Sequence, residues 1–550
     1  MIAARGVFES VRDLRLWAAS LVVCCGIGCG MTDVQRKPEM GALVESLDEI
    51  ERVELEERSR STPVSVEEAT EEFARQAAEP NEARTVVELM LEEARAAALA
   101  NNLDLRIELV DPSIARQTLD QERAKFEWVF FGSAQHRTTM PEEGDASSVN
   151  SYDVGVEAPL PTGGVLAVGV PFSDMDFDDP ATEGVADAAV SVTFIQSLLR
   201  GAGTRINTNS ILVATYSKDA TDATTKLAAI DILASVDVAY WRLYAARKQL
   251  DVSREQYKLA QDQMDHAQKR VDAGAAAKIE IVRAEAGIAS RLGAVIDTET
   301  AVRDRERDLK RIMNRADMPL NSEPGLVTVT EPDPQGLDLD AETLVAAALK
   351  NRMDMARLRL ALAISDIEIE QARDGTLPQV NLDYTYGAAG RAGGVRGALD
   401  NVFGNASEEH TVGLSAQIPL GNRAPRAALQ RARLTKMQGQ LRRDRLAQRI
   451  RQDVYDALDS LRRNWRRIVA AERDVAAAYR TYKVEQSQFQ LGRRTSTDVL
   501  QAASQLAVAQ LQRISAFAEY EIGQVVLARA TGTLLGRGRV QLVPVTLNGK

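Results

Sequence analysis

The chain has 550 residues, enough for three or four domains, and 45% of them are hydrophobic, an ordinary share for a protein that buries a core. Its 67 basic and 79 acidic residues give a net charge of −12, which offers no case for a general nucleic-acid binder. After the first thirty residues, no uninterrupted apolar stretch reaches the ~18 residues that a membrane-spanning helix needs.

Residues 1–29 have the build of a secretory signal, because arginines precede a short apolar run that ends in small residues. All three cysteines of the chain lie in this run, so we expect no disulfide framework. The letters "GIGC" end at Cys29 and resemble the bacterial lipoprotein cleavage box, with Gly26 where that pattern prefers leucine. We therefore predict that Cys29 is lipidated; the alternative is an ordinary signal peptide with incidental cysteines. The Glu-rich residues 30–85 predict an acidic N-terminal tether, with a loosely attached helix as the alternative.

The rest of the chain is duplicated. "ALANNLDLR" at 98–106 matches "ALKNRMDMA" at 348–356, an offset of 250 residues. Further along, each copy carries large apolar side chains at every seventh position, and the two series lie 218 residues apart. They are Val236, Leu243, Leu250, Tyr257, Met264 and Val271 in the first copy, and Val454, Leu461, Ile468, Val475, Tyr482 and Phe489 in the second. Each copy therefore predicts a long helix with one bulky stripe.

Both stripes end close to a glycine, Gly274 in the first copy and Gly492 in the second. A seven-residue repeat keeps one seam against a neighbouring helix over many turns, and the mainly small residues beside it let the backbones approach closely. A helix from about residue 205 to 272 is ~100 Å long at ~1.5 Å per residue. Because such a rod exceeds any globular core, we predict two long helical hairpins that turn at 273–279 and 491–497.

Short segments with strand-like alternation interrupt the helices at the same point of each copy. They are "FEWVFFG" (126–132), "AVSVTFIQSLL" (189–199), "QVNLDYTY" (379–386) and "TVGLSAQIPL" (411–420). Alternation of this kind is expected of barrel strands that face lipid on one side and a wet lumen on the other; the alternative is a soluble sheet with one buried face. Such strands are too few to close a barrel, which needs at least about eight, so several chains would have to share one.

The two offsets differ by 250 − 218 = 32 residues, so the first copy holds extra residues before its long helix. The stretch 151–180 alternates around "LPTGG" and predicts an added β-hairpin with an acidic loop. The expected layout is a first repeat at 86–317, a linker at 318–340, a second repeat at 341–535 and a C-terminal tail at 536–550. The expected elements are strands at about 126–137, 186–199, 378–388 and 409–420, the extra hairpin at 151–172, and helical hairpins at 203–315 and 424–532.

Over about residues 85–535 the sequence resembles the TolC family of bacterial outer membrane efflux proteins, of the lipoprotein type. The resemblance rests on the order of helix, strands and long helical hairpin, given twice. It also rests on the leader "LVAAALKNRMDMARLRLALAISDIEIEQARDGTLPQVNLDYTY", the junction "AQIPLGNRAPRA" and the turn "LGRRTSTDVLQA". In the first-copy junction "FIQSLLRGAG", Ser197 stands where such junctions usually carry proline, as Pro419 does in the second copy.

The resemblance implies a mainly α fold with a transmembrane β part. It implies a homotrimer whose hairpins form a periplasmic α-barrel, continuous with a shared twelve-stranded β-barrel in the outer membrane. This would be the exit duct of a tripartite efflux or type I secretion system, partnered by a periplasmic adaptor (a membrane fusion protein) and an inner-membrane transporter. The hairpin turns, with Gly274, Gly492 and Arg493, would face the adaptor. Added strands at 151–172 fit poorly into twelve, which leaves open whether they join the barrel or form an external hairpin above it.

In this family the second hairpin turn narrows the periplasmic end of the duct. By resemblance, Asp498 matches the first acidic gate position, and Gln501 occupies the second, which is usually acidic. Arg494 matches the basic residue of the closing network, and Phe489 replaces its usual tyrosine. Three Asp498 carboxylates near a symmetry axis would repel anions and attract cations. The alternative is simple helix capping, because Thr495 and Asp498 have the spacing of a capping box.

We do not expect an enzyme. The three histidines, His136, His266 and His410, have no partner at metal-ligand spacing, and no P-loop or dinucleotide fingerprint occurs. The carboxylates are scattered over polar helix faces, so no acid/base pair, cofactor site or metal site can be nominated. The alternative to a duct is a periplasmic adaptor or a structural coiled-coil lipoprotein without a pore. An adaptor would show one helical hairpin between β-domains, whereas this sequence shows two hairpins at matched positions.

Overall fold

The computed structural model describes Glu68 and residues 86–537, apart from 141–146, 178–183, 276, 323, 405 and 492. The expected signal with Cys29, nearly all of the expected tether and most of the expected tail lie outside the described residues. The chain divides into two compact units, Met1–Phe73 and Ala74–Lys550, and every helix and strand below belongs to the second.

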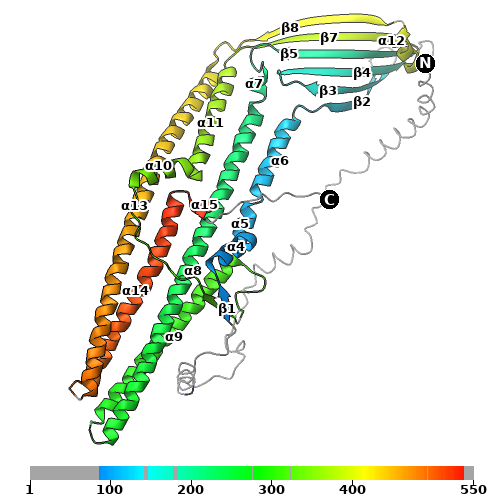
Figure 1. Ribbon diagram of the computed structural model, residues 1–550. Coiled ribbons are helices and arrows are strands. Elements are labelled where there is room, and N and C mark those ends of the chain that lie inside the picture. The colour runs from blue at the N-terminus through cyan, green and yellow to red at the C-terminus, as the bar shows by residue number, and fades with distance from the viewer. Residues whose placement is uncertain are drawn as a thin grey trace, which may run out of the picture. The chain divides into compact units, whose positions relative to one another are not determined.

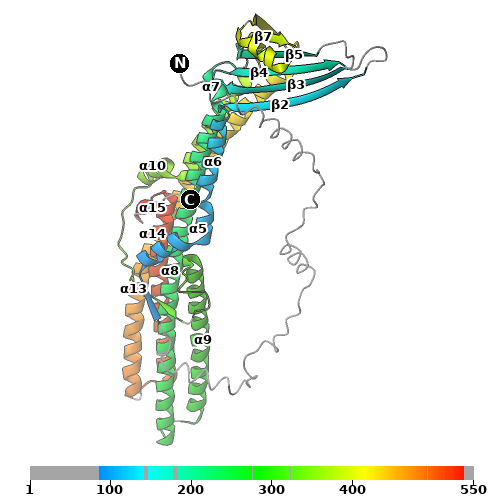
Figure 2. The same ribbon diagram turned by 90° about the vertical axis from the view of Figure 1, so that its right-hand side faces the viewer.

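Four long helices form two hairpins that lie side by side (Figures 1 and 2). The first hairpin is α8 (Asn209–Asp272) with α9 (Ile279–Met313), and the second is α13 (Arg423–Gln490) with α14 (Ser496–Ala530). The 64 residues of α8 span about 96 Å at ~1.5 Å per residue. The chain reverses within the two predicted turns. None of the helices in the described ranges combines the length and apolar composition that crossing a bilayer requires.

The seven-residue stripes supply the cores of the two hairpins. Val236 and Leu243 are buried in the first hairpin, and Val454 and Leu461 are buried in the second. Alanines beside the stripes are buried with them, which lets the helices approach closely. Toward the tips the stripe opens, and Phe489 is only half-buried.

A small two-stranded sheet joins the start of the first repeat to the expected linker. Strand β1 (Val86–Leu89) pairs in parallel with β6 (Gly325–Thr328), so the linker at 318–340 contains a strand. The buried hydroxyl of Tyr240 on α8 donates to the Leu89 carbonyl at 2.9 Å and accepts from the Thr330 backbone N–H at 2.9 Å. One tyrosine thereby fastens β1 and the chain just after β6 to the first long helix.

Shorter helices lead into and out of the strands and complete each repeat. They are α4 (Leu91–Asn101), α5 (Leu103–Glu108), α6 (Asp111–Ala124), α7 (Thr204–Asn207), α10 (Ala341–Asn351), α11 (Met353–Asp374) and α15 (Leu534–Arg537). Helix α4 is held on α8 by a buried ion pair, in which the Arg95 guanidinium contacts both oxygens of Asp237 at 2.6 and 2.7 Å. Arg352, at the start of α11, pairs with Asp453 of α13 at 2.8 Å and secures the second repeat in a similar way.

The remaining strands form one antiparallel sheet at the end of the long helices opposite their tips (Figure 1). In spatial order they are β2 (Val129–Thr139), β3 (Ser147–Pro159), β4 (Gly164–Phe177), β5 (Val185–Ser197), β7 (Gln379–Ala392) and β8 (Ser407–Gln417). Strand β5 pairs with β7 from Ala186↔Ala392 to Ser197↔Asn381, and this pairing joins the two repeats.

The structure gives a place to the extra hairpin, which the sequence left open. Strands β3 and β4 are this hairpin, and they lie inside the sheet between β2 and β5 rather than outside it. Two added strands preserve the alternation of strand direction, so the insertion leaves β2 and β5 antiparallel to their new neighbours. The chain therefore has six strands in this sheet within the described residues, where the twelve-stranded trimer implied by the resemblance allows four.

The glycine-rich residues 387–404 belong largely to a strand and a helix. Residues 387–392 continue β7, and Val395–Gly404 form helix α12, which packs on β5 and β7. A side chain at Gly390 would meet the backbone oxygen of Ala398 at 2.3 Å, so the glycine allows the helix to lie directly on the strand. Ala398 and Val402 are the buried side chains of this contact.

Candidate functional site

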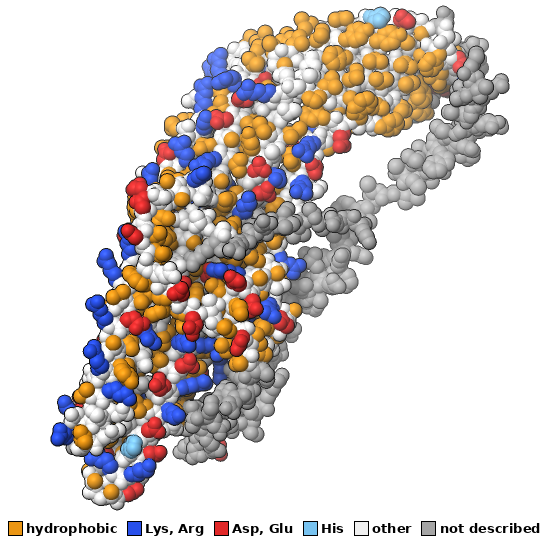
Figure 3. All heavy atoms as spheres, in the orientation of Figure 1, with side chains coloured by type: hydrophobic (Ala, Val, Ile, Leu, Met, Phe, Trp, Pro, Cys, Tyr) orange, Lys and Arg blue, Asp and Glu red, His pale blue; other side chains and the backbone are white. Residues whose placement is uncertain are grey.

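The sheet has two chemically different faces. Because directly paired residues share a face, the register carries the alternation of each strand across all six. On one face lie Phe130, Val154, Val156, Val168, Val192, Phe194, Leu382, Tyr384, Val412 and Leu414. On the other lie Ser133, Asp153, Ser191, Thr193, Asp383 and Thr385. Figure 3 shows hydrophobic side chains gathered over the strands, whereas charged side chains are spread along the helices.

Much of the apolar face is open. The side chains of Phe130, Val412 and Leu414 are 71%, 71% and 70% exposed. Helix α12 covers only the end of this face that is distant from the long helices. An apolar patch of this extent on a soluble protein marks a binding or membrane surface.

The sheet has two free edges. Among the described residues, β2 pairs only with β3 and β8 only with β7, so one side of each of these 11-residue strands presents unpaired backbone groups. Strands with open edges are templates for pairing with another chain. In lipid an unpaired edge would leave polar groups without partners, which the bilayer interior does not tolerate.

The tip of the second hairpin is organised by a capping box. The Asp498 carboxylate accepts hydrogen bonds from the Thr495 backbone N–H at 2.9 Å and the Thr495 hydroxyl at 2.8 Å, and the Asp498 N–H donates back to that hydroxyl. These bonds to Thr495 hold the pKa of Asp498 below its ordinary value, with a smaller contribution from the charge of Arg494. Within one chain, the Asp498 side chain therefore makes the hydrogen bonds of a helix cap. It also keeps the carboxylate charged and fixed at the tip.

The other predicted gate residues contact partners that the sequence did not indicate. The Arg494 Nε lies 3.2 Å from Glu485 Oε2, on the helix that enters the same turn. The Arg270 guanidinium of the first hairpin lies 5.4 Å from the ring centre of Phe489, in the geometry of a cation–π contact. Phe489 therefore interacts with a cation through its ring although it lacks the expected hydroxyl. No local spacing points to this contact, because the two residues lie in different repeats.

The two hairpin tips touch each other. The Ser496 hydroxyl donates to Glu280 Oε2 at 2.9 Å, and Glu280 also pairs with Arg283 at 2.8 Å. An open groove of about 440 Å³ runs between the tips, lined by Arg270, Phe489 and Asp498 among others. Charged groups of both signs therefore meet at the tips of the two hairpins.

The remaining predicted turn residues are exposed or lie outside the described part. Gly274 has φ = +69°, and its N–H donates to the Val271 carbonyl at 2.9 Å, as expected of a left-handed residue that ends a helix. Arg493 and Gln501 are exposed at the tip. Gly492 falls outside the described residues.

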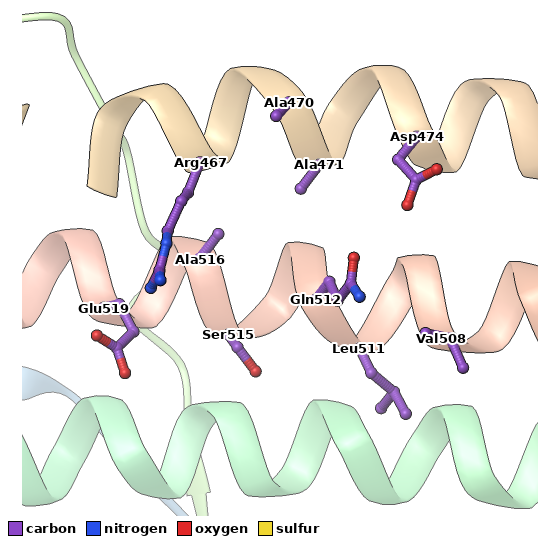
Figure 4. A pocket seen from close by; sticks show the side chains of 10 residues that line it. All are labelled: Arg467, Ala470, Ala471, Asp474, Val508, Leu511, Gln512, Ser515, Ala516 and Glu519. Carbon is purple, nitrogen blue, oxygen red and sulfur yellow. The ribbon is translucent and has the colours of Figure 1, made fainter. Parts of the chain in front are cut away.

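A larger groove of about 660 Å³ lies farther from the tips, between α13 and α14 (Figure 4). Alanines line its middle, and Figure 4 shows Asp474 and Glu519 at opposite ends. General acid–base work needs charged groups that converge on one point, and this groove does not present a pair of that kind. Nor do the described residues contain a group of three or more His, Cys, Asp or Glu side chains able to hold a metal ion.

The histidines take part in local contacts. His136 Nδ1 lies 2.8 Å from Asn150 Oδ1 on the neighbouring strand, and His410 Nδ1 lies 3.0 Å from the Tyr384 hydroxyl. His266 is an exposed residue of α8. His136 and His410 thus lie on the two opposite edge strands of the sheet, β2 and β8.

Comparison with known proteins gives a consistent result. The sequence model described as "Outer membrane efflux protein" matches residues 173–315 and 344–533, which together make 143 + 190 = 333 of 550 residues. No match was found among curated proteins.

Several solved structures share this fold. The outer-membrane channel OprN has 17% identity and a TM-score of 0.61 over 80% of this chain and 90% of its own. The Campylobacter jejuni CmeC outer membrane channel has 15% identity and a TM-score of 0.60 over 81% and 86%. The Neisseria gonorrhoeae MtrE outer membrane channel, solved in its open state, has 19% identity and a TM-score of 0.58 over 81% and 89%. At these identities the likeness shows a common fold.

Proposed function

The chain belongs to the outer membrane efflux protein family, and from this premise we propose that three copies assemble into one exit duct. It is an outer membrane efflux channel with its helical part in the periplasm. In the proposed trimer, the sheets join edge to edge as a β-barrel in the outer membrane, and the hairpins of the three copies continue it as an α-barrel.

One observation carries the proposal: an open sheet with an apolar and a polar face sits on paired helical rods. In this trimer the apolar face contacts lipid, and the free edges of β2 and β8 form backbone hydrogen bonds with the neighbouring copies. The polar face then lines a wet lumen. Exposed apolar side chains on the helices, such as Val469 and Val508, fit the same assembly, because neighbouring copies would cover them.

We further propose a periplasmic adaptor and an inner-membrane transporter as partners. Among the described residues, the exposed tips lie farthest from the sheet, so they are where such partners would dock. Gly274, Gly492 and Arg493 belong to this docking region. Lipidation of Cys29 would add an anchor in the outer membrane, and mass spectrometry of the mature N-terminus tests it.

A periplasmic adaptor or a structural coiled-coil lipoprotein is the competing function. The sheet disfavours it, because neither role calls for an open sheet with one apolar face. Membrane fractionation separates the two: a duct is expected in the outer membrane as a trimer, and an adaptor would follow the inner membrane.

We propose that Asp498, Arg494, Gln501 and Phe489 form the periplasmic gate. Three copies of Asp498 would place three carboxylates around the axis, each held charged by Thr495. Release of Arg494 from Glu485, or of Phe489 from Arg270, would loosen the tip when a partner docks. The contacts that would change on opening are thus both within one chain.

The gate assignment makes a prediction about ion selectivity. Asp498→Asn removes the charge and retains an oxygen that can accept from the Thr495 N–H, so the fold should stay intact. At ~10 Å in water a unit charge contributes ~0.4 kcal/mol, about a twofold preference, so losing three should lower cation-over-anion permeability several-fold. Reversal potentials in planar bilayers under a salt gradient measure this ratio.

Glu280→Gln is the matched control, because it neutralises one acid in the first turn of the return helix at the other tip. We expect a smaller change in selectivity from this variant. An unchanged permeability ratio for Asp498→Asn would remove Asp498 from the gate and leave it a helix cap.

A further inference from the structure

The extra hairpin runs the full height of the sheet. Strands β3 and β4 have 13 and 14 residues, against 11 to 14 for the other strands of the sheet. All 11 residues of β2 pair with β3, and β3 pairs with β4 over its full length. The hairpin therefore has the dimensions of a regular pair of barrel strands.

The hairpin also keeps both faces of the sheet in register. Phe130 of β2 pairs with Val156 of β3, Val156 with Val168 of β4, and Val168 with Val192 of β5. All four side chains lie on the apolar face. On the other face, Glu157 pairs with Ala167 and Ala167 with Thr193. A hairpin outside the barrel would have no need for its apolar and polar faces to continue those of β2 and β5. A hairpin that forms part of the barrel wall needs this continuity in every strand.

The turn of the hairpin is fastened where the long helices begin. The Gly203 N–H donates to the Thr162 carbonyl at 2.9 Å, and the Gln196 side chain donates to the same carbonyl at 2.9 Å. Gly163 has φ = +86°, and a side chain there would meet the Gly201 oxygen at 2.0 Å. The described turn between β3 and β4 spans four residues, while the connections at the opposite end are longer. This asymmetry is typical of outer membrane barrels, whose turns on the periplasmic side are short.

We propose that the trimer closes a barrel of eighteen strands rather than twelve, with β3 and β4 of each copy as wall strands. This inference rests on the proposed trimer. At ~4.8 Å between strands and a tilt of ~40°, a twelve-stranded barrel is about 24 Å across between backbones and an eighteen-stranded one about 36 Å. The hairpin thus gives the outer membrane part a lumen about half as wide again.

The lumen of this wider barrel is acidic. Asp153, Glu157, Asp383 and Glu409 lie on its polar face together with Arg137, while the charge of Asp187 is matched by Arg391 at 2.6 Å. A wide lumen with polar walls and carboxylates suits bulky, hydrated solutes that are neutral or cationic, and a shared barrel triples each charge. The solute class we assign is therefore large, polar and not anionic.

Disulfide trapping in intact outer membranes tests the place of the hairpin. If β3 and β4 are wall strands, the pair Phe130→Cys with Val156→Cys should form a disulfide within one chain. The pair Phe130→Cys with Val192→Cys should not, because two strands separate them by ~14 Å, while a disulfide needs β-carbons within ~4.5 Å. An external hairpin would bring β2 beside β5 and reverse both results, which would overturn the inference.

Counting strands by electron cryo-microscopy of the wild-type trimer gives an independent result. Eighteen strands support the inference, and twelve strands in an intact trimeric pore overturn it while leaving the proposed duct in place. A chain that is not trimeric overturns both. The count does not depend on any variant folding.

Discussion

Replacing Asp237 with alanine is expected to lower the free energy of unfolding by about 3–5 kcal/mol, because it leaves Arg95 without its partner in a site removed from water. The Asp237 side chain is 0% exposed and holds both donor nitrogens of the guanidinium. Burial alone lowers the pKa of Arg95, but the hydrogen bonds and charge of Asp237 outweigh it and raise that pKa above its ordinary value. Denaturant unfolding of the detergent-solubilised protein, followed by far-ultraviolet circular dichroism, measures the loss.

Asp231→Ala is the matched control for that prediction. Asp231 lies on the same helix and pairs with Arg529 at 2.8 Å, but its side chain is 53% exposed and that of its partner 56%. An exposed ion pair contributes only about 0–1 kcal/mol. If the two variants lose equal stability, the Arg95–Asp237 pair does not fasten α4 to the first hairpin as the geometry indicates.

Substituting arginine for Val192 is expected to cost about 2–4 kcal/mol and to reduce the amount of trimer in the outer membrane, since a charge on the lipid face of a barrel is destabilising near the bilayer centre. Val192 lies in the middle of β5 and pairs with Val168 and Tyr386 on the apolar face. Heat stability of the trimer on semi-native gels and its yield from membranes measure the effect.

Thr193→Arg is the control, because the adjacent residue lies on the polar face opposite Thr385. A charge there would extend into the lumen, so we expect a nearly unchanged trimer and a shift of ion selectivity toward anions. Equal loss of trimer in both variants would contradict the assignment of the two faces.

The sequence predicted the features that depend on periodicity. The seven-residue stripes placed Val236 and Val454 in the two helical cores, and the alternation of 379–386 and 411–420 predicted strands that the structure has. Both patterns arise because one face of a helix or strand meets a single environment, either a packed core or lipid. The sequence of that one segment is therefore enough to reveal the pattern. The difference of 32 residues between the repeat offsets predicted an added hairpin on the same kind of evidence.

Contacts between distant segments could not be predicted in this way. Arg270 meets Phe489, and the Tyr240 hydroxyl joins the strand that opens the first repeat to the linker that follows this repeat, without any shared spacing. Helix α12 lies against β7 because Gly390 has no side chain to keep the two apart. A glycine-rich composition does not by itself indicate such a contact. The place of β3 and β4 depends on which strands they pair with, and alternation alone says nothing about partners.

The shared pore is tested most directly by the protein purified from outer membranes in detergent. Its mass in solution and its single-channel conductance in planar bilayers can be measured on the same sample. The account predicts a trimer that requires detergent and forms discrete, stable conductance steps. A monomer that remains in solution without detergent and opens no channel would contradict it.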